Sequence, residues 1–436
     1  MKISTIIKIN KQGRLRVDKS WAYADKSNHD TSYLTHNFYS YPAKFIPQVA
    51  ARLILENSKT DDIVIDPFMG SGTTIVEALL NKRVGIGCDI NFVAYLVTKT
   101  KTTPINTKLL DKEILRIQLD LENRMNGKYN YYLSHSHRFV PEHERIEYWF
   151  RKKQKEKLAI IFARIHQVKN IKVRNLFFVA FAQILKICSI WLQSSVKPQR
   201  DFTKSDFDPL TMFLSRVKIM SKRNKEFFEK LDPEIHKRIN DFRKVSRNDA
   251  RQIPCSNNTA SLIVTSPPYV TSYEYADLHQ LPSLWFSKMK DINTFRKNFI
   301  GSVFKIETKQ VKIHSSTGEK IIEKLGGKKK AKEIRKYYYE MFDCFKEMKR
   351  VLKKNGKACI VIGDTHYRNI DILNHTVFIE QMTSMGFEIE NVIMRKVTSK
   401  MLPTYRDPKN GRFAKTTSKN IKLVHPKEYI IIAKKK

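Results

Sequence analysis

The feature that most constrains the fold is a short buried strand that runs straight into a glycine-containing turn and a helix. Residues 61–68, DDIVIDPF, have the β-branched, apolar character of a strand covered on both faces, and TTIVEALLNK (73–82) follows the turn as a helix. A second buried strand, RVGIGCDI (83–90), comes next. Strand, turn, helix and strand within about thirty residues form a βαβ unit. The chain is therefore predicted to be an α/β protein with a doubly wound, Rossmann-like sheet.

The α/β rhythm stops near residue 104 and returns near 246. Residues 104–245 contain long charged and aromatic segments of helical character without convincing strands, which predicts a helical insertion. The predicted organisation is thus 1–103, 104–245 and 246–436. The last part holds a helix over 332–354 that Asn355-Gly356 is expected to cap, and basic, weakly periodic loops over 290–333 and 399–425. Its predicted strands are 259–269, 357–364, 387–397 and 427–435.

The charge of the chain favours a polyanionic partner. Lys and Arg number 81 against 43 Asp and Glu, which gives a formal net charge of +38. A strongly positive surface attracts nucleic acid first of all, through displacement of the counterions around the phosphates. The alternative is a generic Lys-rich solvated surface, because composition by itself names no partner.

Cysteine usage and hydropathy predict a cytoplasmic protein with no metal and no membrane partner. The five cysteines are scattered, with no CxxC pair and no histidine at metal-ligand spacing. The apolar stretch near the amino terminus is interrupted by Lys8 and Lys11, and nothing elsewhere approaches eighteen uninterrupted apolar residues.

The turn after the first strand places two glycines, Gly70 and Gly72, where a backbone comes close to a ligand at the carboxyl end of a sheet strand. It is neither a Walker loop, since no GK[ST] closes it, nor a GxGxxG dinucleotide turn. Asp89 ends the next strand, close to where an adenosine-binding α/β fold puts a carboxylate on the ribose hydroxyls. The turn and the carboxylate together predict a nucleoside-containing ligand.

A second constellation, Thr265-Ser266-Pro267-Pro268-Tyr269, directly follows the apolar strand SLIV. Two consecutive prolines remove two backbone donors and stiffen the turn, which leaves carbonyl oxygens as fixed acceptors beside the Ser266 hydroxyl and an aromatic face. Such a turn suits a flat group that carries an NH2. An exocyclic aromatic amine is a poor nucleophile until acceptors make its nitrogen tetrahedral, and Ser266 Oγ with the Pro267 carbonyl can do this.

These motifs resemble those of the S-adenosylmethionine-dependent DNA amino-methyltransferases. DPFMGSGTT (66–74) matches the family's cofactor motif DPF-x-GSGTT, and SPPY (266–269) matches its catalytic motif [DNS]PP[YF]. YPAKFIP (41–47) is similar to the motif that precedes the cofactor loop and helps to hold methionine. The stretch from 247 to 269 resembles the run-in to the catalytic motif, which gives Asp249 as the partner of the adenine ring.

The resemblance implies S-adenosylmethionine as cofactor and double-stranded DNA, with the target base flipped out, as substrate. It implies a methyltransferase fold and a partner restriction endonuclease of the kind that such enzymes often accompany. Three segments compete for the role of target-recognition region: the helical block 104–245, which could equally be scaffold, and the basic loops 290–333 and 399–425, which are expected to contact DNA. The serine of TSPPY is most typical of enzymes that methylate cytosine N4. The implied catalytic residues are Ser266, Pro267, Pro268 and Tyr269, the last stacking on the flipped base. The implied cofactor-binding residues are Tyr41, Pro42, Lys44, Phe45, Asp66, Pro67, Phe68, Gly70, Ser71, Gly72, Thr73, Thr74, Asp89 and Asp249.

Several alternatives stay open at the level of sequence. Adenine N6 is the first alternative target, and an RNA or tRNA guanine-N2 methyltransferase shares the DPF turn and a PP[YF] pocket. A non-catalytic basic nucleic-acid binder is disfavoured by the intact glycines and TSPPY. Cytosine-C5 methylation would use a Pro-Cys thiolate, but Pro254-Cys255 lies before its strand and not at the carboxyl end.

Overall fold

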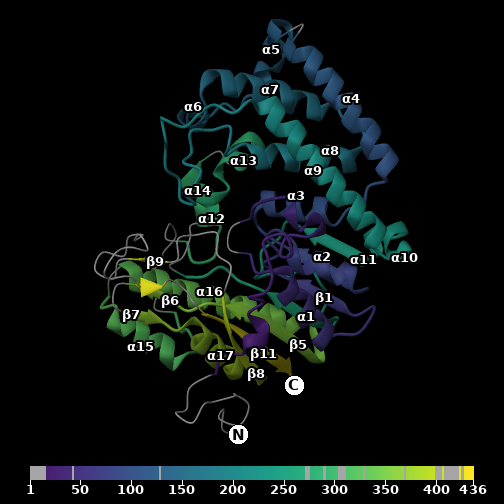
Figure 1. The fold of residues 1–436 in the computed structure, drawn as a ribbon. Helices are drawn as coiled ribbons and strands as arrows, with labels where there is room; N and C mark the ends of the chain where they lie inside the picture. The colour runs from purple at the N-terminus through teal and green to yellow at the C-terminus, as the bar shows by residue number, and fades with distance from the viewer. Residues whose placement is uncertain are drawn as a thin grey trace.

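We describe a computed structural model of the chain, which covers residues 16–41, 44–126, 129–270, 275–287, 291–302, 311–327, 329–367, 370–397, 405–406, 422–423 and 427–436. Two blocks are evident in Figure 1, an α/β block with its sheet below and a set of long helices above. No helix of these residues is long and apolar enough to cross a membrane.

A seven-stranded sheet forms the centre of the α/β block, in the order β3-β2-β1-β4-β5-β11-β8. The first five strands in this order are parallel, and β11 runs antiparallel to both β5 and β8. The strands are β1 Ile63–Asp66, β2 Val84–Cys88, β3 Arg243–Ser246, β4 Ala260–Thr265, β5 Leu352–Ile362, β8 Phe387–Lys396 and β11 Lys427–Lys435. The doubly wound α/β fold with a mostly parallel sheet is thereby confirmed.

Alternate side chains of the central strands pack on opposite faces of the sheet, and both faces are covered. Val64 and Leu262 belong to the apolar cluster under α1 (Pro47–Asn57) and α2 (Thr73–Leu80), whereas Ile65 and Ile263 belong to the cluster under the helices of the other face. Those helices are α15 Ser316–Lys324, α16 Lys329–Val351 and α17 Asn374–Ser384. Continuous burial explains why these strands are apolar runs without polar alternation.

The helical block has its own core of aromatic and aliphatic side chains, and α3 (Phe92–Lys101) of the sheet unit joins that core. Helix α13 (Gln280–Trp285) also contributes to it, through Leu281 and Trp285. The block consists of α4 Thr107–Asn126, α5 Tyr129–Ser136, α6 Glu144–Trp149, α7 Lys152–His166, α8 Ile171–Ile184, α9 Pro209–Lys230, α10 Pro233–Lys237 and α11 Ile239–Phe242. One continuous core therefore fixes the helical block to the carboxyl edge of the sheet.

Short elements complete the described chain. They are the 3-10 turns Lys19–Trp21, Leu34–Asn37 and His137–Phe139, the helices α12 Tyr275–Leu278 and α14 Ile292–Lys297, and the strand pairs β6 Thr365–Tyr367 with β7 Ile370–Ile372 and β9 Tyr405–Arg406 with β10 Lys422–Leu423.

The predicted helix cap at Asn355-Gly356 is wrong. Helix α16 ends at Val351, and Asn355, with φ +64°, lies inside β5. Leu352 pairs with Ala260, but the next pairing joins Lys357 to Leu262, so the intervening residues form an irregularity in the strand. A left-handed Asn suits a bulge as well as a helix end, and here it serves the bulge.

The prediction that 290–333 is loop is also wrong. Helices α14, α15 and the start of α16 occupy much of it, and Ile313 and Ile321 are buried in the core between the sheet and its covering helices.

The strand β3 was not predicted, because only four residues pair with β2 at the sheet edge. Most of 399–425 lies outside the described residues.

Candidate active site

A cavity of about 900 Å³, open to solvent, lies at the carboxyl ends of β1, β2 and β4. This is the edge at which open α/β sheets bind ligands. Most of the residues that the sequence singles out line the cavity. They are Tyr41, Lys44, Phe45, Asp66, Pro67, Phe68, Gly70, Ser71, Thr73, Asp89, Asp249, Ser266 and Pro268.

The glycine turn between β1 and α2 requires glycine for two reasons. Gly72 has φ +75°, and a Cβ there would lie 2.6 Å from Cγ2 and 2.7 Å from Oγ1 of Thr98. Gly70 has φ +46°, and a Cβ there would lie 3.3 Å from the Tyr41 ring. Thr98 Oγ1 also donates to the Gly70 carbonyl at 3.0 Å, so α3 holds the turn in place. The turn cannot accept larger residues without moving its neighbours.

Asp89 supports this turn from the end of β2. One carboxylate oxygen accepts from the Gly70 N–H at 3.0 Å and the other from the Asn91 N–H at 2.8 Å. Burial raises the pKa of Asp89 to about 6, because desolvation outweighs the two backbone hydrogen bonds. Each oxygen keeps a further lone pair, so the carboxylate can still accept from a ligand hydroxyl.

Asp66 connects the two motif-bearing strands. Its Oδ1 accepts from Thr265 Oγ1 at 2.6 Å, and burial raises its pKa to about 6. Thr74 Oγ1 donates to the Val264 carbonyl at 3.0 Å, which ties the start of α2 to β4. Thr74 and Asp66 therefore set the position of the cofactor-type turn relative to TSPPY.

Tyr41, Lys44 and Phe45 form another part of the cavity wall. Lys44 Nζ donates to the His36 carbonyl at 3.1 Å, and burial, with the nearby Arg216, lowers its pKa to about 8. The Tyr41 ring lies 4.5 Å from the ring of His279, measured between centroids. Burial lowers the pKa of His279 to about 3, so this ring is neutral, and neither of its nitrogens has a partner among the described residues.

Asp249 lines the cavity with its carboxylate already engaged. Arg251 donates to it through Nε at 3.0 Å and Nη2 at 2.6 Å, and also through its backbone N–H at 2.9 Å. Burial acts to raise the pKa of Asp249, but these hydrogen bonds lower it overall. Arg251 is itself held by Glu340 at 2.9 Å, so the carboxylate has a fixed orientation.

The TSPPY turn presents its residues in different directions. Ser266 and Pro268 line the cavity, and the Pro268 carbonyl accepts from Tyr337 Oη at 2.7 Å. Tyr269 donates through Oη to Glu428 at 3.2 Å, and its ring packs so closely over Gly363 that a Cβ there would lie 2.8 Å from Cε2. Tyr337 thus fixes the carbonyl of the second proline.

Five predicted residues do not line the cavity or cannot be placed. Gly72, Thr74, Pro267 and Tyr269 are adjacent to it in the chain but absent from its lining, and Pro42 lies outside the described residues. Six lining residues were not predicted: Met69, Ile90, Ala250, Asn298, Phe299 and Ile300. Ile90 could have been predicted, because an apolar residue directly after Asp89 suits contact with a flat ring. Residues 298–300 could not, because only the tertiary fold brings them to the cavity and they belong to no motif.

Cys255 lies away from the cavity. It precedes β4, and its carbonyl accepts from Arg350 at 2.8 Å at the amino end of the strand. Burial raises the pKa of its thiol, which is the opposite of what a nucleophilic thiolate needs.

A comparison with family models decides what this site belongs to. The model described as DNA methylase, for N6 and N4 amino-methyltransferases, matches residues 5–100 and 260–436, which contain both motifs and interrupt at the helical block. The chain belongs to this DNA methylase family. The family uses S-adenosylmethionine as methyl donor, so this amino-methyltransferase does too.

Curated relatives carry matching names. The type II methyltransferase M.MvaI of Kocuria varians is 25% identical over 433 residues, 94% of each chain. The orphan methyltransferase M.BamHII of Bacillus amyloliquefaciens is 45% identical over 65 residues, 15% of this chain and 24% of that protein. A crystal structure of an S-adenosylmethionine-dependent methyltransferase from Methanosarcina mazei aligns with 91% of this chain and 98% of its own at TM-score 0.31 and 9% identity.

The cavity of this DNA methylase fits its methyl donor. Ser71 Oγ is buried without a partner among the described residues and lines the cavity, as does the cationic Lys44. Two carboxylates, Asp89 and Asp249, lie at the other strand ends, and Phe68, Ile90 and Ile300 supply apolar surface. A nucleoside with an amino acid attached needs this mixture of hydroxyl acceptors, ring surface and charge.

Proposed function

We propose that this amino-methyltransferase transfers the methyl group to the N4 amine of cytosine in double-stranded DNA. The observation that carries the proposal is Ser266, a neutral hydroxyl rather than a carboxylate, at the carboxyl end of β4 in the wall of the cavity that the glycine turn also lines. The acceptor of the target amine and the residues around the methyl donor thus share one space.

In this proposal the cofactor is held by three groups of residues. Asp89 accepts from the ribose hydroxyls, with Ile90 and Phe68 against the adenine and Asp249 facing its ring. Lys44, Tyr41 and Phe45 hold the methionine end. When bound, S-adenosylmethionine supplies an electrophilic methyl group on a sulfonium.

The residues of the TSPPY turn act on the target amine. Ser266 Oγ and the Pro267 carbonyl each accept one N–H of the amine, which favours the tetrahedral nitrogen and stabilises the positive charge that develops on it. Tyr269 stacks on the flipped base, and its hydrogen bond to Glu428 limits the rotation of the ring. The hydrogen bond of the Pro268 carbonyl to Tyr337 keeps the turn rigid.

We further propose that the enzyme is the modification half of a restriction–modification pair. M.MvaI, which matches along almost the whole chain, is named a type II methyltransferase. The strongly positive charge of +38 suits a duplex DNA substrate.

The test is to express the chain in a host that lacks DNA methylation and to sequence its genomic DNA by chemistry that distinguishes N4-methylcytosine from N6-methyladenine. N4-methylcytosine at one recurring sequence is the expected result. N6-methyladenine at that sequence would refute the cytosine assignment while leaving amine methylation intact.

A further inference from the structure

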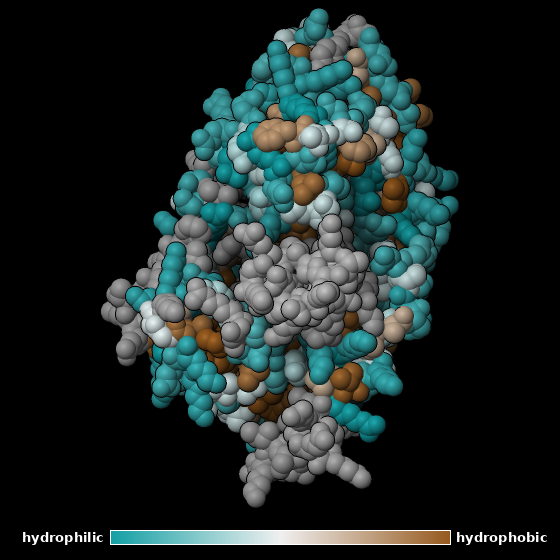
Figure 2. Space-filling model, turned by 60° about the vertical axis from the view of Figure 1, so that its left-hand side comes forward, coloured by the Kyte–Doolittle hydropathy of each residue, from teal (hydrophilic) through white to brown (hydrophobic). Residues whose placement is uncertain are grey.

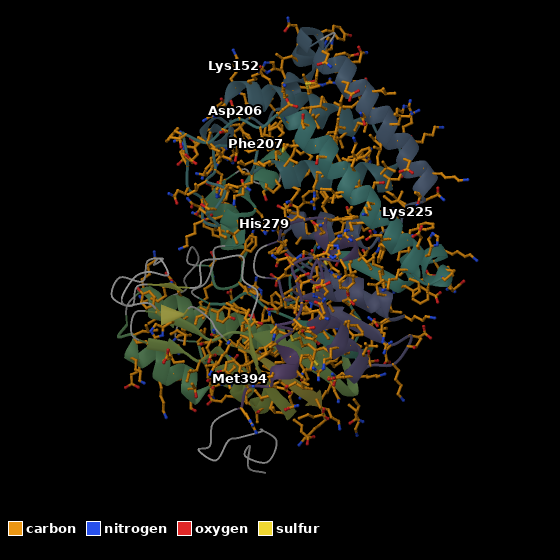
Figure 3. All side chains as sticks on the ribbon, viewed as in Figure 1. Lys152, Asp206, Phe207, Lys225, His279 and Met394 are labelled. Atoms are coloured by element: carbon orange, nitrogen blue, oxygen red, sulfur yellow. The ribbon has the colours of Figure 1, made fainter. Side chains whose placement is uncertain are left out.

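The helical block carries an ordered hairpin that the active site does not use. Trp191 and Arg200 form an antiparallel bridge, flanked by hydrogen bonds from Leu192 N to the Gln199 carbonyl at 2.8 Å and from Asp201 N to the Ile190 carbonyl at 2.7 Å. The hairpin connects α8 to α9. Figure 3 places Asp206 and Phe207, just beyond it, on the left of the helical block, with Lys225 of α9 on the opposite side.

Polar bonds hold this hairpin in shape, together with the burial of Ile190 and Trp191 in the core of the helical block. Lys204 Nζ donates to the carbonyls of Lys186, Ser189 and Trp191, each at 2.8 Å, which uses all three of its N–H groups. Arg151 donates to the Phe202 carbonyl at 2.8 Å. The backbone is thus fixed, with Ile190 and Trp191 packed in the core and Phe202 exposed.

The outward side chains form a stack that we call the aromatic–arginine ladder, Tyr148–Arg200–Phe202. The guanidinium carbon of Arg200 lies 4.1 Å from the centroid of the Tyr148 ring and 4.3 Å from that of Phe202. Phe202 is 65% exposed and Tyr148 43%. Figure 2 brings this side forward and shows apolar side chains interrupting the hydrophilic surface of the helical block.

The charge of Arg200 is not neutralised locally. Among the described residues, no carboxylate lies within ion-pair distance of its guanidinium, and its Nε has no hydrogen-bond partner. The neighbouring acids are occupied: Asp206 pairs with Arg151 at 2.6 Å, Asp208 with Lys157 at 2.5 Å, and Asp201 accepts from Thr203. The ladder therefore presents a cation whose plane two rings fix.

The ladder is connected rigidly to the chain that follows the catalytic motif. Trp191 stacks on Trp149 with centroids 5.1 Å apart and planes at 23°. Trp149 Nε1 donates to Gln280 Oε1 at 3.0 Å, and Gln280 opens α13 just after the TSPPY segment. His279, its neighbour in the chain, lies between the two blocks in Figure 3. Trp149 and Gln280 thus link the ladder to the segment that follows the catalytic motif.

We propose that Arg200 reads a guanine in the duplex beside the target base, with Tyr148 and Phe202 fixing the plane of its guanidinium. The inference rests on the proposed function, because it takes double-stranded DNA as substrate. A guanidinium matches O6 and N7 of guanine with two parallel hydrogen bonds. A phosphate needs no fixed plane, and the many flexible lysines of this chain can meet phosphates, so a preorganised fork is useful chiefly for a planar base edge.

The test is binding selection from a library of random duplexes with the full chain and the variant Arg200→Lys, which keeps the charge but loses the fork. The wild-type pool should contain a sequence with guanine at one defined position. In Arg200→Lys the preference for guanine at that position should fall by roughly ten- to hundredfold, while the other positions keep their preferences. Phe202→Ala, at a mostly exposed side chain, should weaken the same preference less and carries the test should Arg200→Lys misfold.

Lys225→Gln is the matched control, since Lys225 is an exposed cation on the far side of the block, and it should leave the preference unchanged. An unaltered selected sequence in both ladder variants would overturn the proposal. Uniform weakening over all sequences would also overturn it and assign Arg200 to phosphate. Binding selection needs no methyl transfer, so failure of the proposed reaction would show separately, as a selected sequence that gains no methyl group.

Discussion

The α/β block and the helical block carry their functional residues in different ways. In the α/β block these residues stand at strand ends, and backbone constraints fix them: Gly72 has φ +75° with Thr98 beside it, and Asp89 holds the turn by accepting from the Gly70 N–H. In the helical block the half-buried Arg200 and the exposed Phe202 stand on a hairpin without any motif. A turn whose backbone must lie close to a ligand requires glycines at fixed positions, which can be recognised in the sequence. A surface that binds a partner through exposed side chains requires no such pattern.

The largest effect that this comparison predicts is at the glycine turn. Gly72→Val adds a side chain where even a Cβ lies 2.6 Å from Thr98, in a left-handed conformation that valine avoids. S-adenosylmethionine binding, measured by calorimetry, should fall below detection. Gly327→Ala is the control, because Gly327 also has positive φ, +65°, but nothing lies within 4 Å of its Cβ position. Full affinity in Gly72→Val would mean that the turn holds no cofactor.

The next largest effect is on the rate of the methyl-transfer step and not on cofactor binding. Ser266→Ala should lower the rate of methyl transfer by roughly 10²–10³ and leave cofactor affinity nearly intact, because the hydroxyl acts mainly in the transition state. Single-turnover rates at saturating DNA measure this. Cys255→Ser should stay active in the same assay, since amine methylation needs no thiolate. An inactive Cys255→Ser with a fully active Ser266→Ala would indicate carbon methylation instead.

The third effect is on DNA binding and follows from the variant Lys204→Met in the helical block. Removing the ammonium takes one donor away from each of three carbonyls, of which that of Lys186 keeps Ser189 Oγ as a donor, and loosens the hairpin. Specific DNA binding should weaken by about tenfold, on the scale of one unsatisfied buried polar group. Cofactor affinity should not change. A loss of cofactor affinity equal to the loss of DNA affinity would mean that the two blocks do not act separately.

The smallest effect is a pH dependence of cofactor affinity. Binding of ribose hydroxyls favours ionised Asp89, whose pKa burial raises to about 6, so affinity should fall by at most about tenfold per pH unit as the pH drops from 6 towards 4. This titration does not lower the free energy of unfolding of the free protein. Because the pKa of Asp89 is higher in the folded than in the unfolded chain, its protonation stabilises the fold as the pH falls from 6 towards the ordinary value of 3.8.

Asp89→Asn should lower affinity and flatten this profile in calorimetry at several pH values. Asp66 has a pKa raised to about 6 in the same cavity, so the slope that remains in Asp89→Asn should disappear in Asp66→Asn/Asp89→Asn. A steep profile in the double variant would place the titrating group elsewhere.

Much of the sheet and of the cavity could be predicted from sequence, because buried parallel strands are continuous apolar runs and the glycine turn obeys local rules. Asn298, Phe299 and Ile300 could not, since the fold of a segment far along the chain brings them to the cavity. Asn355 misled because its left-handed backbone fits a helix end and a bulge equally. The ladder was missed because it depends on ring contacts between Tyr148 and a hairpin some fifty residues later.

The most direct test of the central claim is to identify the methylated nucleoside itself. The purified chain is incubated with unmethylated DNA and S-adenosylmethionine that carries a deuterated methyl group, and the DNA is digested to nucleosides for mass spectrometry against standards. We predict deuterated N4-methyl-2′-deoxycytidine as the product with the wild-type chain and its near absence with Ser266→Ala. Deuterated 5-methyl-2′-deoxycytidine, deuterated N6-methyl-2′-deoxyadenosine, or a labelled product that Ser266→Ala forms at the wild-type rate, would contradict the account.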